Sequence, residues 1–133
     1  MLFPGSKKAP SREIGFRTEA LAEEFLKQQG LKTISRNFRC RRGEIDLIML
    51  DGNMLVFVEV RYRKHSRYGS GADSVNAQKQ QKIIIAAQFF LQHNKMHRNR
   101  NCRFDVLSLS VSTDDGADPN GLKYQWIKNA FET

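Results

Sequence analysis

Four charged residues interrupt two apolar runs in the middle of the chain, where hydrophobic strands would be expected. The stretch GEIDLIMLDGNMLVFVEVRYR carries Glu44 and Asp46 in its first run, and Glu59 and Arg61 in its second. Charged side chains are rarely buried unless they are paired or bind a metal. These four residues are therefore the first candidates for a functional site.

The turn between the two runs decides which of these charges face each other. Gly52-Asn53 is a two-residue hairpin signal, so the runs are expected to form antiparallel strands. In that register Asp46 faces Glu59, and Glu44 faces Arg61. Both pairs share one face of the sheet, because residues two apart on a strand point the same way. A loop longer by one residue would place Asp46 and Glu59 on opposite faces instead.

The two facing pairs favour different chemistry. An ion pair explains Glu44 and Arg61, whereas Asp46 and Glu59 repel each other across the strands. In a partly buried site one of these two carboxylates binds a proton, or a cation lies between them. With Cβ atoms roughly 5 Å apart, two carboxylates suit a hard divalent ion. The alternative is that the strand ends reach solvent and the charges are hydrated, but their concentration in apolar strands favours a functional site.

Two amphipathic helices are predicted on either side of the hairpin in the sequence. Residues 12–29 form the first, and Glu19 lies at the border of its apolar arc. Residues 77–92 form the second, with Asn76 as its N-cap. Lys79 lies on the apolar arc of this second helix, so it either points towards the hairpin or extends its amine to solvent.

The remaining apolar segments predict an α/β fold. The element order is helix, three strands, helix, two strands, and the strand–helix–strand passage implies a crossover connection. Both faces of the hairpin strands are apolar, which is typical of a central mixed sheet of about five strands flanked by helices. Residues 1–11 are expected to form a flexible lead and residues 12–133 a single domain. The predicted strands are 31–38, 45–50, 54–60, 104–111 and 124–127, and the predicted loops are 39–43, 62–72, 93–101 and 113–121.

The composition favours a cytoplasmic protein that binds a polyanion. The chain has 133 residues and a net charge of +8, which attracts nucleic acid. It contains no apolar run long enough to span a membrane and no secretory signal at its start. Cys40 and Cys102 are isolated and have no metal-ligand spacing, so a reducing compartment is the simplest interpretation.

Basic residues gather in the sequence on both sides of the hairpin's open end. We expect them to form a rim near the carboxylates, where a phosphate backbone can bind and a base can stack. The alternative is a set of solvated basic loops. The candidate nucleic-acid-binding residues are Arg36, Arg39, Arg41, Arg42, Arg63, Lys64, Arg67, Tyr68 and Lys82.

Several motifs together resemble one bacterial family. The chain carries, in that family's order, TEALAEEFL, RNFRCRRGEIDLIM, LVFVEVRYR, GSGADSVNAQKQQKI and CRFDVLSL. In these motifs, which cover most of the chain, it is similar to the YraN-like family of uncharacterised bacterial proteins. That family is placed among the restriction-endonuclease-like, or PD-(D/E)XK, nucleases, near the Holliday junction resolvases. The resemblance implies their fold, with the acidic site on the hairpin.

The resemblance also implies a metal site. Asp46 corresponds to the motif aspartate, Glu59 to the acidic residue of the ExK motif, and Glu19 to the helical glutamate that often completes the site. These three residues would hold Mg²⁺ or Mn²⁺ as the cofactor. A metal ion held there lowers the pKa of a bound water and neutralises charge on the phosphorus.

Three further residues receive roles around that site. Arg61 stands where the usual pattern has lysine; it keeps a positive charge but cannot act as a general base. Lys79 is the candidate that compensates for this difference, and Glu44 is expected to orient Arg61. The predicted catalytic residues are Asp46, Glu59, Arg61 and Lys79.

The function implied is metal-dependent hydrolysis of phosphodiester bonds in nucleic acid. DNA is favoured over RNA as the partner, with structured or branched DNA as the substrate, and no membrane partner is expected. Resolvase-like proteins commonly act as dimers, so a homodimer stays open. Two alternatives also stay open: a non-catalytic nucleic-acid-binding protein on the same fold, which Arg61 favours, and a scaffold whose charges serve folding or assembly alone.

Overall fold

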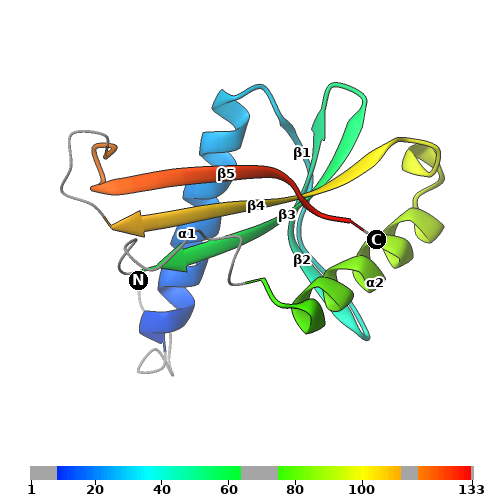
Figure 1. The fold of residues 1–133 in the computed structure, drawn as a ribbon, viewed down its shortest axis with the longest axis horizontal. Helices are drawn as coiled ribbons and strands as arrows, with labels where there is room; N and C mark the ends of the chain where they lie inside the picture. The colour runs from blue at the N-terminus through cyan, green and yellow to red at the C-terminus, as the bar shows by residue number, and fades with distance from the viewer. Residues whose placement is uncertain (1–8, 64–74, 112–116, 133) are drawn as a thin grey trace.

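The computed structural model describes residues 9–63, 75–111 and 117–132, and Figure 1 shows their arrangement. Two α-helices, one short 3₁₀ helix and five strands follow one another along the chain. Their order and bounds are α1 (Ala9–Gln28), β1 (Lys32–Cys40), β2 (Gly43–Asp51), β3 (Met54–Arg63), α2 (Ala77–His93), η3 (Lys95–His97), β4 (Cys102–Val111) and β5 (Leu122–Phe131).

The five strands form one sheet in the order β1-β2-β3-β4-β5. All neighbours are antiparallel except β3 and β4, which are parallel and connected through α2. In Figure 1, α1 lies behind the sheet and α2 lies in front of it. The predicted α/β class, with a five-stranded mixed sheet between helices, is thereby confirmed.

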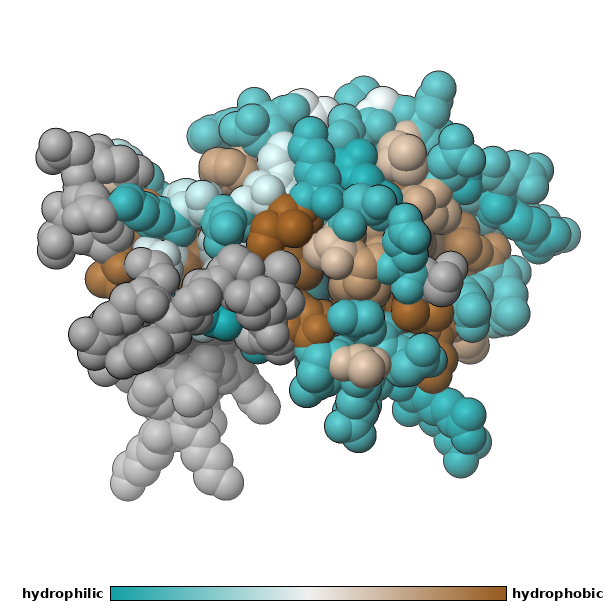
Figure 2. Space-filling view, viewed as in Figure 1, coloured by the Kyte–Doolittle hydropathy of each residue, from teal (hydrophilic) through white to brown (hydrophobic). Residues whose placement is uncertain are grey.

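Each helix covers its own apolar core on one face of the sheet. The core on the α2 side contains Ile83 and Phe90 of the helix against Ile48 and Phe57 of the sheet. The core on the α1 side contains Leu26 of the helix against Leu47, among others. Figure 2 shows the α2 side, where apolar side chains lie at the centre of the face and hydrophilic ones surround them. Within the described ranges, no helix has the length and apolar character needed to cross a membrane.

The register of the central hairpin agrees with its sequence. Asp51 pairs with Met54 across the predicted two-residue turn, and the pairing continues to Leu47 and Val58. Gly52 adopts a φ of +62°, which a glycine at the first central position of a hairpin turn provides without strain. Asn76 caps α2 as predicted, since its side chain accepts a hydrogen bond of 2.8 Å from the Lys79 amide.

Several element bounds differ from the prediction. The predicted basic loop 39–43 is wrong, because β1 and β2 form a hairpin in which Cys40 pairs with Gly43 around a two-residue turn. β3 continues through Arg63 because it pairs with β4 over this length. β5 is much longer than the predicted strand 124–127, since pairing with β4 holds polar residues in extended conformation. Tertiary pairing thus overrides weak local strand preference.

The N-terminal and loop predictions are covered only in part. α1 begins at Ala9, so the last residues of the predicted lead 1–11 are helical, and residues 1–8 lie outside the described part. The predicted loop 93–101 contains the short helix η3. Of the predicted loops 62–72 and 113–121, residues 64–72 and 113–116 lie outside the described part.

Side chains of β2 alternate between the two faces of the sheet, and this alternation shifts by one residue at Asp46. We call this point the phase change of β2. Ile45 packs in the core on the α2 side, whereas Leu47 packs in the core on the α1 side. In a regular strand Ile45 and Leu47 would lie on one face, so the alternation of side chains is broken at this point. The ladder between β2 and β3 ends at Leu47 and Val58, so the paired register stops just before Asp46 and Glu59.

The β1–β2 hairpin lies close against α2. A Cβ atom added to Gly43 would lie only 2.0 Å from the backbone oxygen of Lys82, so only glycine allows this approach. The hairpin tip is thereby held beside the helix that carries Lys79 and Lys82.

Candidate acidic site and nucleic-acid interface

Three elements contribute carboxylates to the place where β2 and β3 separate. Asp46 lies at the phase change of β2, Glu59 lies in β3 and is only 4% exposed, and Glu19 lies in α1. Asp46 is the charged neighbour of both glutamates, whose pKa values it raises. The structure therefore brings together the three residues that the sequence analysis assigns to a metal.

One backbone hydrogen bond fixes the position of Asp46. The amide of Val60 donates to Oδ2 of Asp46 over 2.8 Å. Beyond Val58 the paired register of β2 and β3 ends, and the Asp46 side chain accepts this β3 amide. The aspartate therefore holds the two separating strands together through its carboxylate.

All three carboxyl groups are pushed towards their protonated forms. Burial, followed by the negative charge of Asp46, raises the pKa of Glu59 to about 8. Burial and the same neighbour raise the pKa of Glu19 to about 7. Burial also raises the pKa of Asp46 above its ordinary value, although the hydrogen bond from Val60 opposes this rise. Buried anions of like charge favour a proton or a cation between them.

Two cationic side chains approach the acidic site from the α2 side. Nζ of Lys79 lies 3.7 Å from Oε2 of Glu59 and 3.9 Å from Oε1 of Glu44. Nη1 of Arg61 lies 3.5 Å from Oε2 of Glu59. Lys79 therefore points towards the hairpin, which answers the question left open by its place on the helix.

The ion pair predicted between Glu44 and Arg61 is wrong. Glu44 contacts Lys79 and also Arg39, whose Nε lies 3.6 Å from its Oε2. The cause is the end of the β2–β3 ladder before these residues, after which the facing positions of the predicted register no longer meet. The contacts of Glu44 hold Lys79 rather than orienting Arg61.

Asn37 is a site residue that the sequence analysis missed. It lies in β1 between the pairs Arg36–Leu47 and Phe38–Ile45, and therefore opposite Asp46. Its φ of 51° is in the left-handed region, which asparagine tolerates better than most residues. A hydrogen bond from its side chain opposes the rise in the pKa of Glu19. The available signal was an asparagine within a strand, where this residue type is depleted.

The donor set fits a hard divalent cation. Carboxylate oxygens are the ligands that Mg²⁺ and Mn²⁺ prefer, and Glu19, Asp46 and Glu59 supply them from three different elements. Among the residues that the structure describes, no three acidic, histidine or cysteine side chains already enclose a common point. Binding an ion therefore requires these carboxylates to close on it, with Asp46 held in place by Val60.

A basic groove lies beside the acidic site, between the β1–β2 hairpin and α2. It has a volume of about 670 Å³, and its basic side chains are Arg39, Arg41, Arg42 and Lys82. Glu44 also lines this groove and contacts Lys79, which in turn contacts Glu59. The groove thus leads from the hairpin tip to the carboxylates.

Of the other predicted nucleic-acid-binding residues, the structure describes Arg36 and Arg63, and neither lines the basic groove. Arg36 points to the α1 side, where its Nε lies 2.7 Å from Oε1 of Glu23 and lowers the pKa of that carboxyl. Arg63 lies at the end of β3 and is half-buried. Lys64, Arg67 and Tyr68 lie outside the described residues.

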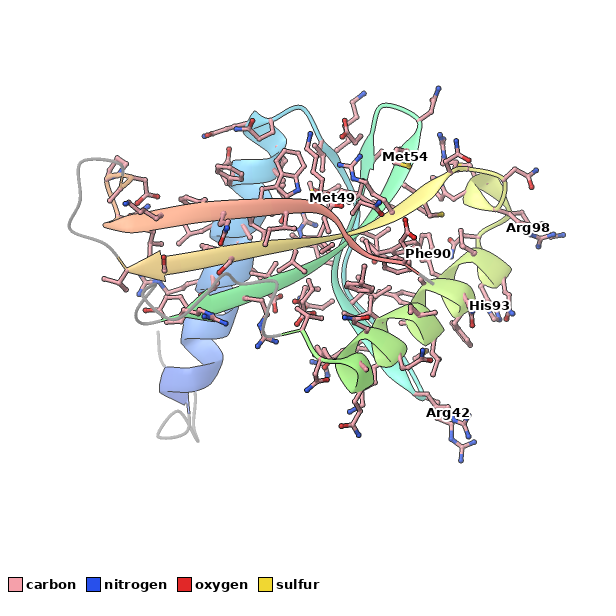
Figure 3. All side chains as sticks on the ribbon, in the orientation of Figure 1. Arg42, Met49, Met54, Phe90, His93 and Arg98 are labelled. Atoms are coloured by element: carbon pink, nitrogen blue, oxygen red, sulfur yellow. The ribbon has the colours of Figure 1, made fainter. Side chains whose placement is uncertain are left out.

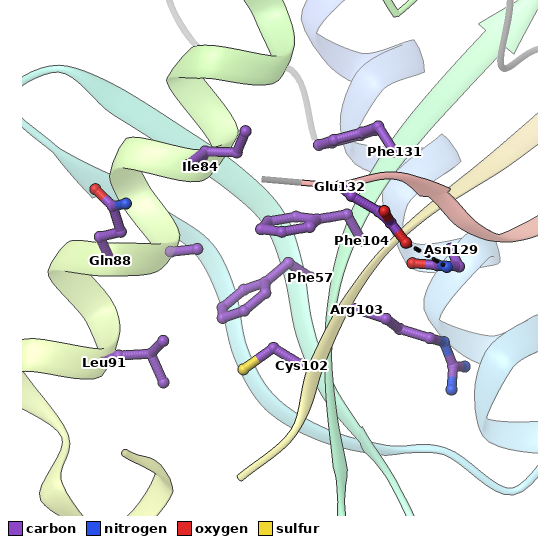
Figure 4. A pocket seen from close by; sticks show the side chains of 11 residues that line it. Phe57, Ile84, Gln88, Leu91, Cys102, Arg103, Phe104, Asn129, Phe131 and Glu132 are labelled. Carbon is purple, nitrogen blue, oxygen red and sulfur yellow. Dashed lines mark hydrogen bonds between the residues drawn. The ribbon is translucent and has the colours of Figure 1, made fainter. Parts of the chain in front are cut away.

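A separate depression between α2 and the β4–β5 pair has a volume of about 350 Å³ (Figure 4). Phe57, Phe104 and Phe131 form its apolar wall. Its cation, Arg103, is already held by Asp51 and Asp105 through hydrogen bonds of 2.9 Å. The lining also carries Glu132, whose Oε1 accepts a 3.4 Å hydrogen bond from the Asn129 side chain. Among its described lining residues, the depression therefore offers no unpaired cation to a phosphate.

These features define an α/β protein with one buried and two half-buried carboxylates at the opening of a mixed sheet. The model of the family described as "Uncharacterised protein family UPF0102" matches residues 18–109, a range that includes Glu19, Asp46, Glu59 and Lys79. The chain belongs to this family, which confirms the YraN-like resemblance at the level of the family.

Relatives in two Pseudomonas species match nearly the whole chain. The "UPF0102 protein" of Pseudomonas syringae pv. syringae is 45% identical over 127 residues, which cover 96% of this chain and 99% of the relative. The "UPF0102 protein" of Pseudomonas aeruginosa is 48% identical over 122 residues, which cover 92% of this chain and 94% of the relative. The chain is thus similar to bacterial proteins of about its own length.

Proposed function

We propose that this protein is a metal-dependent nuclease of the restriction-endonuclease-like, or PD-(D/E)XK, type. The observation that carries the proposal is the meeting of Glu19, Asp46 and Glu59 at the opening of the sheet, where each carboxyl pKa is raised. Mg²⁺ or Mn²⁺ bound by these residues would supply a water of lowered pKa and positive charge at the phosphate.

The chain's own cations have a separate role in the proposed reaction. Arg61 and Lys79 lie within 4 Å of the Glu59 carboxylate, on the side of the sheet that α2 covers. Positive groups fixed in a partly buried site stabilise the negative charge that develops on a phosphate during cleavage. Arg61 provides a planar guanidinium that can donate two parallel hydrogen bonds to a phosphate, whereas Lys79 provides a compact point charge.

The proposed substrate is DNA rather than RNA, with structured or branched DNA favoured by the family resemblance. The basic groove supports a nucleic-acid partner, because Arg41, Arg42 and Lys82 are exposed and the groove continues towards the acidic site. Phosphate contacts of this kind position a strand without selecting its sequence. A cytoplasmic location and a homodimer complete the proposal.

A second candidate is a nucleic-acid-binding protein without catalysis. The observation that favours it is the pairing of Glu59 with both Arg61 and Lys79, because these two cations can neutralise the glutamate without a metal. On this alternative the acidic site holds the open end of the sheet together, and the basic groove provides the function.

Metal titration by calorimetry tests the nuclease proposal first. We expect the wild type to bind Mg²⁺ or Mn²⁺, and both Asp46→Asn and Glu59→Gln to lose this binding. Glu24→Gln is the matched control, since Glu24 is an exposed carboxylate on the same helix as Glu19. If the wild type binds neither metal, with or without DNA, the nuclease proposal is wrong.

A cleavage screen separates the two candidates. Branched, single-stranded and duplex DNA are incubated with the wild type and with Asp46→Asn, in Mg²⁺ and in Mn²⁺. A nuclease loses cleavage in Asp46→Asn and keeps DNA binding. A protein that binds both metal and DNA, but cleaves none of these substrates, favours the non-catalytic alternative.

A further inference from the structure

A hollow on the α1 side of the sheet lies beside the acidic site and takes no part in the metal chemistry proposed above. It has a volume of about 250 Å³. Leu21 of α1, Tyr62 of β3, Val111 of β4 and Leu122 of β5 form its apolar lining. Arg17 and Asn120 add polar groups to its wall.

Exposed apolar side chains of the described residues are concentrated in this hollow. Among the described residues four large hydrophobic side chains are exposed, and two of them, Tyr62 at 40% and Val111 at 45%, line this hollow. Val111 pairs with Leu122 across β4 and β5, and Tyr62 pairs with Leu109, a residue of the core on the α1 side. Apolar side chains gathered in a surface hollow mark a place where a ligand can exclude water.

Two residues that line the hollow are adjacent in sequence to residues of the acidic site. Tyr62 directly follows Arg61 in β3, and Thr18, which also lines the hollow, directly precedes Glu19 in α1. Consecutive Cα atoms are about 3.8 Å apart. The hollow therefore begins one residue from Glu19 in α1 and one residue from Arg61, a contact of Glu59, in β3. It lies on the side of the sheet opposite Lys79.

We propose that this hollow accepts an unpaired nucleobase of the strand held at the acidic site. The Tyr62 ring offers a stacking surface, and Leu21, Val111 and Leu122 supply apolar contact around it. Arg17 offers a positive charge to the adjoining phosphate, and the Asn120 amide offers both a donor and an acceptor to the base edge. The hollow is smaller than the roughly 300–1,000 Å³ pockets that enclose drug-sized ligands, so it suits one planar ring system.

The inference rests on the nucleic-acid binding of the proposed function and narrows its substrate class. A base in a continuous duplex is paired and stacked, so extracting it costs free energy. A base in a single strand, at a frayed end or at a branch point enters the hollow at lower cost. The protein is then expected to prefer nucleic acid with unpaired bases, independently of their sequence, because every base has a face that can stack.

The test compares two probes of equal charge in the absence of metal. One is a short thymidylate oligonucleotide, and the other is a chain of the same length made of abasic deoxyribose phosphates. Fluorescence anisotropy gives the affinity of the wild type, Tyr62→Ala, Tyr62→Phe and Phe89→Ala for each probe. Phe89 is the matched control, because it is 41% exposed and lies on α2, away from the hollow.

We expect the wild type to bind the thymidylate probe about tenfold more tightly than the abasic one. Tyr62→Ala is expected to lose this preference, whereas Tyr62→Phe and Phe89→Ala keep it. Val111→Asn, an exposed change in the same wall, is expected to reduce the preference as well, and it provides a second variant if Tyr62→Ala does not fold.

Two results overturn the inference. Equal affinity of the wild type for both probes means that no base is bound, and a preference that persists in Tyr62→Ala means that it is bound elsewhere. If the carboxylates bind metal and the two probes bind equally, the base-site inference is wrong and the nuclease proposal is unaffected. If the protein prefers the thymidylate probe but binds no metal, the nuclease proposal is wrong and the base-site inference is supported.

Discussion

The Asp46 carboxylate makes one stabilising and one destabilising interaction at neutral pH. One oxygen accepts the Val60 amide and so holds β2 and β3 together. The same group also raises the pKa values of Glu19 and Glu59, which lie near it. A cation relieves this repulsion without breaking the hydrogen bond. At neutral pH the metal-free acidic site therefore favours bound protons, and the proposed metal ion would relieve the same repulsion.

The raised pKa values predict that the metal-free protein loses stability as the pH rises. Glu19 and Glu59 titrate at about 7 and about 8 in the folded protein, against 4.5 ordinarily. Between these values the folded state holds protons that the unfolded chain has released, so the free energy of unfolding falls with increasing pH. We expect a loss of several kcal/mol between about pH 5 and pH 8, because each group contributes up to about 1.4 kcal/mol per pH unit before solvent screening. Urea unfolding in a chelator measures this loss.

Glu59→Gln is the control for this pH dependence. It removes one of the two titrating glutamates, so the fall in stability with pH becomes shallower. Added Mg²⁺ is expected to stabilise the wild type more at about pH 8 than at about pH 6, because bound metal needs ionised carboxylates. Stability that is independent of pH in the chelator would contradict the described arrangement of carboxylates.

At the scale of elements, the contact between the β1–β2 hairpin and α2 depends on Gly43. A Cβ at this position overlaps the Lys82 carbonyl, and both atoms belong to backbone that cannot easily move. We expect Gly43→Ala to destabilise the fold by about 1–3 kcal/mol in urea unfolding. Arg42→Ala, one residue away at the exposed tip, is expected to change stability by less than about 0.5 kcal/mol. Equal effects of the two changes would show that the hairpin does not rest on α2.

The β4–β5 pair is held by a buried carboxylate that the sequence did not identify. Asp105 is fully buried and accepts hydrogen bonds from Arg103, from Nε1 of Trp126 and from the backbone amide of Asn129, each at 2.9 Å. Asp105→Asn places an amide group among these donors and removes the charge that pairs with Arg103. We expect it to cost about 3–5 kcal/mol, measured by thermal and urea unfolding.

Trp126→Phe provides the comparison for that network. It removes one hydrogen bond to Asp105 and keeps an aromatic ring against Phe25. Its expected cost is about 1 kcal/mol. A cost of Asp105→Asn no larger than that of Trp126→Phe would show that the charge itself contributes little.

Local patterns were enough to predict some elements and not others. The two-residue turn at Gly52 fixed the hairpin register, and the cap at Asn76 marked the start of α2. The phase change at Asp46 was not predictable, because it depends on how the sheet bends between two cores. Asp46 and Glu59 followed from the hairpin pattern, and the metal-binding role of Glu19 followed from the family resemblance. Asn37 became visible only through its backbone conformation.

The whole molecule carries its positive charge in several places, and these are not equivalent. Figure 3 shows Arg42 at the tip of the β1–β2 hairpin and Arg98 beyond the C-terminal end of α2. Both are exposed and both contribute to the net charge of +8. Only the hairpin tip belongs to the basic groove that continues to the acidic site. Net charge alone therefore does not say where a nucleic acid binds.

Salt dependence of DNA binding distinguishes a located interface from general attraction. Each phosphate that a cation neutralises releases counterions and steepens the fall of affinity with salt. The double variant Arg41→Ala/Arg42→Ala is expected to reduce the slope of log affinity against log salt by about 2. Lys95→Ala/Arg98→Ala loses the same charge at η3 and is expected to leave the slope unchanged. Equal effects of the two double variants would mean that the groove is not the interface, because only total charge would then matter.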